Sequence, residues 1–163
     1  MTSVAVRLIP PTGGELLGDP EGVQDRFLVE AADTDGRMSV IEHVMAPSSL
    51  AAPMHRHTRE DEFSFVLEGR VGAILGDEEV IASTGDLLFK PRGQWHTFWN
   101  AGTERARVLE LISPAGLEEL FRRLDTLDDW PDPSSLAEMA DSYGCAIDLD
   151  ATMPLVEKHG LRF

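Results

Sequence analysis

Short runs of β-type residues, each ended by turn residues, constrain the fold of this chain more than any other feature. Arg26–Glu30 and Met38–Met45 flank the turn cluster Asp33–Gly36, which predicts a hairpin. Further runs follow at close spacing: Phe63–Leu67, Val71–Leu75, Val80–Ala82, Leu87–Lys90, Trp95–Trp99 and Arg107–Ile112. Many short strands at regular spacing predict a mainly β fold, either a sandwich or a barrel.

The hydrophobic period changes after Ile112. Leu117, Leu120, Phe121 and Leu124 recur at helical spacing and form one apolar stripe. Two more helices are predicted, one from Asp132-Pro133 to Gly144 and one from about Met153 to His159. Because each helix has a single apolar face, we expect residues 113–163 to form a C-terminal helical extension packed on the barrel of residues 1–112. We do not expect a separate domain.

Composition excludes several classes of partner. The chain has 163 residues with 14 Lys and Arg against 29 Asp and Glu, a net charge of −15. This charge repels phosphate backbones and anionic lipids, so we expect neither nucleic acid nor a membrane as partner. Cys145 is the single cysteine, which excludes an intrachain disulfide and thiolate-rich metal sites. Met1–Arg7 lacks the pattern of a signal peptide, and we expect a cytoplasmic protein.

The pair His55 and His57 is the first sign of a functional site. On a strand, side chains at i and i+2 point to the same face, so the two imidazoles would form a ready metal chelate. An isolated pair of this kind also arises by chance on an exposed strand. Here an acidic cluster of Glu60, Asp61 and Glu62 follows, and it offers a carboxylate ligand.

Alternation along the next strand favours Glu62 as that carboxylate. Glu62 shares a face with Ser64 and Val66, whereas Asp61 shares the opposite face with three bulky apolar residues. A metal cavity favours the less crowded face. Since Glu62 lies an odd number of positions after His57, the polar stretch between them must bend if both side chains are to converge.

A second segment carries another candidate ligand, His96. A strand runs into a turn containing Pro91 and Gly93, and the next strand bears His96. Phe98 and Asn100 share the face of His96, so Phe98 is either an aromatic wall beside the metal or ordinary barrel core. The tryptophans Trp95 and Trp99 lie on the other face, where we expect packing.

These two segments together resemble the motifs of the cupin superfamily. The first motif is matched by His55, His57, Glu62 and Gly69, with Ser49 in place of its leading glycine. Every position of the second motif is matched, by Gly85, Pro91, Gly93, His96 and Asn100. The resemblance covers roughly residues 25–115 and is closest to the single-domain, quercetinase-like group of cupins.

The resemblance implies a double-stranded β-helix, the jelly-roll barrel of cupins, with one divalent metal ion. The ion would be Fe, Mn, Ni, Co, Cu or Zn, held by His55, His57, Glu62 and His96. Glu62 would be a ligand or act as a catalytic general base. The substrate pocket beside the metal would include Phe98, Ser64, Val66 and Asn100.

Three functions stay open on this resemblance. The first is a metal-dependent dioxygenase that uses O2 to cleave a small aromatic or enolic, flavonol-like compound. The others are a metal-dependent isomerase, lyase or cyclase, and a non-catalytic binder of small ligands. We also expect a homodimer, with Met38–Met45 or the N-terminal segment covering a sheet edge. His43 and His159 lack ligand spacing, so we expect each to be satisfied by a hydrogen bond or exposed to solvent. We expect Cys145 to pack rather than to act as a nucleophile.

Overall fold

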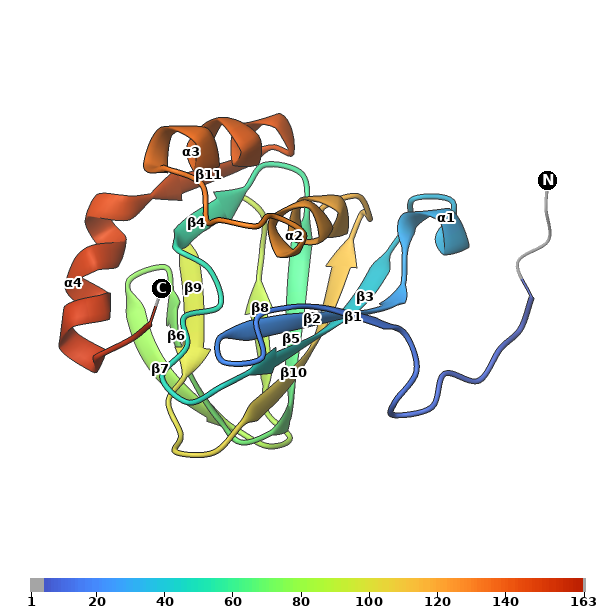
Figure 1. Cartoon of the computed structure of the whole chain (residues 1–163), viewed down its shortest axis with the longest axis horizontal. Coiled ribbons are helices and arrows are strands. Elements are labelled where there is room, and N and C mark those ends of the chain that lie inside the picture. The colour runs from blue at the N-terminus through green and yellow to red at the C-terminus, as the bar shows by residue number, and fades with distance from the viewer. Residues whose placement is uncertain (1–4, 163) are drawn as a thin grey trace.

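Two antiparallel sheets face each other in the computed structural model, which describes residues 5–162 (Figure 1). The six-stranded sheet has the order β1-β2-β3-β10-β5-β8, and the five-stranded sheet has the order β11-β4-β9-β6-β7. The start of the chain, Met1–Val4, lies outside the described residues. The strands are β1 (Glu15–Gly18), β2 (Val23–Val29), β3 (Ser39–Met45), β4 (Met54–His57), β5 (Asp61–Glu68), β6 (Arg70–Leu75), β7 (Glu78–Ser83), β8 (Leu87–Lys90), β9 (His96–Asn100), β10 (Ala106–Ser113) and β11 (Cys145–Asp148).

Alternating burial along the strands produces the core between the two sheets. Every second side chain of β10 is buried, as expected for a strand with one face turned inward. Met45, Val66, Val71 and Val108 come from both sheets and pack together inside. The predicted mainly β jelly roll with short C-terminal helices is therefore confirmed.

The helices are α1 (Ala31–Thr34), α2 (Glu118–Asp125), α3 (Pro133–Ser142) and α4 (Leu149–His159). Leu120 of α2 and Ala140 of α3 pack with Phe27 and Ile41 of the six-stranded sheet. Figure 1 shows α2 and α3 over one end of the barrel, while α4 runs down one side. Across residues 5–162, no helix combines the length and the apolar content that crossing a membrane requires.

Three local predictions need correction. The C-terminal segment is not purely helical, because Cys145–Asp148 forms β11 and pairs with β4. The turn predicted at Asp33–Gly36 contains the last two residues of α1, although β2 and β3 do pair as a hairpin. The strand within Met38–Met45 cannot cover a sheet edge, because β3 is hydrogen-bonded to β2 on one side and β10 on the other.

A glycine in β6 makes room for a buried tryptophan, and this contact gives a stability prediction. Gly72 is the register partner of Trp99, and a methyl group at Gly72 would overlap the Trp99 indole. Gly72→Ala should lower the free energy of unfolding by about 1–3 kcal/mol, the usual cost of overpacking, as measured by urea titration. The control Gly22→Ala meets only the flexible Asp19 side chain and should stay within about 0.5 kcal/mol of wild type. Equal losses in both variants would contradict this packing argument.

Candidate metal centre

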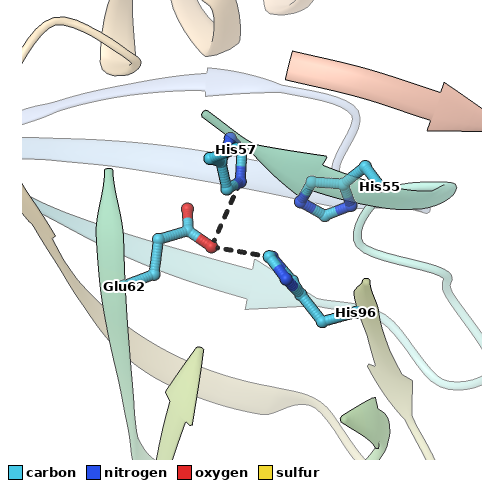
Figure 2. Close-up of side chains that lie close together, drawn as sticks. All are labelled: His55, His57, Glu62 and His96. Carbon is cyan, nitrogen blue, oxygen red and sulfur yellow. Dashed lines mark hydrogen bonds and ion pairs between the residues drawn. The ribbon is translucent and has the colours of Figure 1, made fainter. Parts of the chain in front are cut away.

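Four buried side chains from three strands converge on one point at the end of the barrel beneath α2 and α3. His55 and His57 come from β4, Glu62 from β5 and His96 from β9. One potential ligand atom from each lies within 4.8 Å of the others. Figure 2 shows the three imidazoles and the carboxylate facing one another, with Glu62 in contact with His57 and His96.

The convergence depends on a change of sheet between the first two ligand strands. β4 belongs to the five-stranded sheet and β5 to the six-stranded sheet, so residues 58–60 cross from one to the other. This crossing is the bend that the odd spacing of His57 and Glu62 requires. The neighbouring Asp61 points away and pairs with Arg92 at 2.6 Å.

Backbone carbonyl groups orient two of the histidines. His55 Nδ1 donates to the carbonyl oxygen of Pro53 at 2.7 Å, and His96 Nδ1 donates to that of Gln94 at 3.0 Å. A carbonyl oxygen only accepts, so Nδ1 carries the proton in both rings and a neutral ring has its lone pair on Nε2. Such partners fix the tautomer and the ring angle of metal-binding histidines.

The charges around the four side chains suit a cation site. Burial lowers the pKa of His55 well below its ordinary value, as do His96 and His57, so this imidazole is neutral. Burial raises the pKa of Glu62, but Lys90 and His57 outweigh it and bring the pKa well below its ordinary value. Glu62 is therefore an ionised carboxylate at the centre of three imidazoles.

A buried lysine that the sequence motifs did not reveal lies behind Glu62. Lys90 Nζ is 3.1 Å from Glu62 Oε2 and 2.9 Å from Glu110 Oε1. Ser64 donates to the other oxygen of Glu110 at 2.7 Å. These residues come from three neighbouring strands, and no sequence spacing connects them. The network holds the Glu62 carboxylate in place.

A cavity of about 460 Å³ opens from this cluster toward the helices. His55, His57 and Glu62 line one part of it, and Phe98 lies on its wall. Apolar side chains from the C-terminal part of the chain also line it: Leu120, Phe121, Leu124, Leu127, Leu136, Ala140 and Ile147. The volume and the mixed lining are typical of a site for a small organic molecule.

Four side chains were predicted for the pocket. In the part of the chain that the structure describes, Phe98 is the one among them that lines this cavity. Val66 lies in the apolar core of the barrel. Asn100 donates to the carbonyl oxygens of Met45 and Glu104 and so holds a loop. Alternation placed these side chains on the inner face correctly, but it does not measure depth along the barrel axis.

Two residues without ligand spacing also lie next to the site. Cys145 packs in an apolar cluster, as predicted, and His43 is satisfied by a hydrogen bond to Asp25. Cys145 of β11 is the register partner of His57 and lines the cavity. His43 of β3 is buried, lines the same cavity and contacts Asp25 at 2.6 Å. Sequence spacing gave no signal for either, because β2, β3 and β11 meet the ligand strands only in the folded barrel.

The donor set fits a divalent ion. Three imidazole nitrogens and one carboxylate are borderline ligands that suit Fe, Mn, Ni, Co, Cu or Zn. All four side chains are buried and within coordinating reach of one centre, and none is a soft thiolate. The cluster is therefore a potential metal-binding site whose ion remains to be identified.

Comparison with known proteins shows what this part of the chain is similar to. Residues 41–112 match a family model described as "Cupin domain", and this range holds all four converging side chains. Residues 41–112 are thus similar to a cupin domain. A solved RmlC-like cupin from Shewanella frigidimarina superposes with a TM-score of 0.59 and 16% identity. The match covers 71% of this chain and 96% of that one, and it shows that the cupin fold extends beyond the matched range.

Two relatives are similar in sequence, and one of them also has a solved structure. The tetracenomycin polyketide synthase protein TcmJ of Streptomyces glaucescens is 26% identical over 71% of this chain and 76% of its own length. The structure of the polyketide cyclase RemF of Streptomyces resistomycificus has a TM-score of 0.57 and 25% identity. That match covers 67% of this chain and 80% of RemF.

Metal binding by the four converging side chains is expected to weaken as the pH falls. Burial lowers the pKa of His57, but the Glu62 carboxylate more than reverses this and raises it to about 10. His57 is therefore protonated at about pH 7 without metal, and a metal must displace that proton. Zinc affinity should rise about tenfold per pH unit between about pH 7 and 9, as measured by calorimetry. A binding heat that does not change with the ionisation enthalpy of the buffer would contradict proton release.

Proposed function

We propose that this chain is a metal-dependent enzyme that closes a ring in a small polyketone, or isomerises a similar enolic compound. One observation carries the proposal: the His and Glu cluster opens directly into a largely apolar cavity of about 460 Å³. A site built only to bind metal would be closed, whereas this one leaves room for an organic substrate beside the ligands.

The sequence relatives support this class of reaction. TcmJ is by name a polyketide synthase protein, and RemF is a polyketide cyclase. The two matches cover 71% and 67% of this chain. Their likeness favours the cyclase or isomerase alternative over the flavonol dioxygenase that the motifs suggested.

The residues of the cavity suit a reaction in which a carbon acid attacks a carbonyl group. A divalent ion at the cluster would supply Lewis-acid polarisation of a substrate carbonyl. The aromatic rings of Phe98 and Phe121 line the cavity and would hold a flat, conjugated substrate. The apolar side chains of α2 and α3 would exclude water and favour a folded conformation of the substrate over an extended one.

The test uses a simple substrate and a choice of metals. Protein stripped of metal would be reloaded separately with iron(II), manganese, nickel, cobalt, copper and zinc. Each form would be given diacetylacetone, a linear triketone whose intramolecular aldol condensation yields orcinol and water. Orcinol formation would be followed by chromatography, with and without oxygen. Quercetin would serve as the parallel substrate for a dioxygenase.

Each result has a distinct meaning. Orcinol formed without oxygen, above the rate of free metal ions, would support the proposed cyclase. Oxygen uptake with quercetin, and no orcinol, would replace the proposal with the dioxygenase. Saturable binding of diacetylacetone without turnover by any metal form would favour a non-catalytic binding protein.

A further inference from the structure

A second polar cluster lies in the same cavity, apart from the four candidate ligands. It consists of Asp25 on β2, His43 on β3 and Asp125 at the end of α2, all of which line the cavity. Asp25 and His43 are buried. The metal-binding motifs include none of these residues, and the proposed function has so far given them no role.

The geometry of His43 leaves one ring nitrogen available. Its Nδ1 is 2.6 Å from Asp25 Oδ1, a short hydrogen bond that assigns the proton to Nδ1. Its Nε2 is 3.7 Å from Glu110 Oε2, which is longer than a hydrogen bond. The rings of Phe98 and Phe121 flank the imidazole, each with its centroid 5.6 Å away. His43 is thus held by a carboxylate on one side and by aromatic rings on two others.

This arrangement is poorly explained by stability alone. A buried ion pair seldom stabilises a fold more than apolar side chains of the same volume would. The wall of the cavity is mostly apolar, and the hydrogen-bonded pair of Asp25 and His43 is an exception within it. A histidine that is oriented by a carboxylate and exposed to a substrate cavity is the usual arrangement of a general base.

The charges that face His43 favour its holding a proton. Burial lowers the pKa of His43, but Asp25 and Glu110 outweigh it and raise the pKa above its ordinary value, while Lys90 acts in the opposite direction. From the side of α2, burial raises the pKa of Asp125 to about 8, and repulsion from Asp25 adds to this effect. An imidazole under these conditions can take up a proton and return it near neutral pH.

We propose that His43, oriented by Asp25, is the catalytic acid–base residue of the ring closure. This inference rests on the proposed function. Nε2 removes a proton from a carbon next to a carbonyl group of the substrate, which is a terminal methyl group in diacetylacetone. The electron pair of that C–H bond forms the new bond to the carbon of the most distant carbonyl group and closes a six-membered ring. The π electrons of that carbonyl move to its oxygen, which then receives the proton from the His43 imidazolium. The product of this step is an isomer of the substrate, so no oxidant or other co-reactant is needed.

The first test measures kinetics in three variants of the zinc-loaded protein. His43→Gln should lower kcat for orcinol formation by about 100-fold or more, with a small change in KM, as expected for loss of a general base. Asp25→Asn should shift the acidic limb of the kcat/KM profile to lower pH, because loss of the carboxylate lowers the pKa of His43. His159→Gln is the matched control, since His159 lies on α4 outside the cavity, and it should leave both parameters unchanged.

The second test needs no turnover and uses the wild-type protein, so it remains informative if the His43→Gln variant fails to fold. Protein labelled with nitrogen-15 in its histidines would be titrated with orcinol and with diacetylacetone while the ring signals are followed. The Nε2 signal of His43 should show a neutral Nδ1–H tautomer at high pH and should shift when either probe binds.

The outcomes separate the two proposals. If kcat of His43→Gln stays within about threefold of wild type, His43 is not the general base. Probe binding that shifts the His43 signal without turnover would contradict the cyclase, yet it would keep His43 as a substrate-binding group. Probe binding that leaves the His43 signal unchanged, or no binding at all, would overturn the role of His43.

Discussion

His96→Ala is expected to weaken divalent metal binding by more than about 100-fold, because even groups that only orient a metal ligand contribute 10–100-fold. His96 contacts two other members of the cluster, with its Nε2 3.1 Å from Glu62 Oε2 and its ring centroid 4.3 Å from that of His55. Its loss leaves two imidazoles and one carboxylate, a set that holds borderline ions less firmly. Competition with a fluorescent zinc chelator would measure the affinity, and turnover of diacetylacetone should fall with it.

The control for this prediction is His159→Ala. His159 also contacts a carboxylate, with its Nε2 2.9 Å from Glu79 Oε1, but it lies near the surface of α4. This variant should keep the metal affinity of the wild type. Thermal unfolding of both variants without metal would show whether the fold survives. A folded His96→Ala protein with wild-type affinity would remove His96 from the ligand set.

Lys90→Met should lower the free energy of unfolding of the metal-free protein by about 3–5 kcal/mol, the usual result of removing one partner from a buried ion pair. Lys90 is 1% exposed in its side chain and separates Glu62 from Glu110, which are also buried. Without the ammonium group, two carboxylates remain in the protein interior with their main counter-ion gone. Urea unfolding at neutral pH would measure the change.

The matched control is Lys158→Met, at a surface pair. Lys158 Nζ is 2.6 Å from Glu79 Oε2, but its side chain is 61% exposed. Exposed pairs contribute roughly 0–1 kcal/mol, so this variant should unfold almost as the wild type does. If the two lysine variants lose the same free energy, the buried network does not support the fold as we describe.

More of the candidate metal centre than of the surrounding cavity could be predicted from the sequence. The same-face rule placed His55 with His57, and side-chain crowding distinguished Glu62 from Asp61. Both arguments use only neighbours along one strand, and the structure brings these side chains together. Whether they bind a metal stays a prediction until an ion is measured.

The cavity was less predictable because it depends on strands distant in sequence. Lys90, Glu110 and His43 meet only when β3, β5, β8 and β10 lie side by side. Ser64 and Val66 do lie on the inner face, but alternation does not tell how deep they are. β11 was missed because its four residues lie between two helices and carry little pattern of their own. The proposed reaction class changed for a similar reason, since motifs that hold a metal say little about the substrate.

The pairing of β11 with β4 also bears on the order of folding. Cys145 is the register partner of His57, and Ile147 is the partner of His55, so the strand with two candidate ligands is completed by residues from near the C-terminus. A chain still being made on the ribosome therefore lacks this edge until most of its length has emerged. Contacts between such distant segments slow folding. A metal ion that reached His55 and His57 early would meet an unfinished sheet, so metal loading should follow completion of the chain rather than guide its folding.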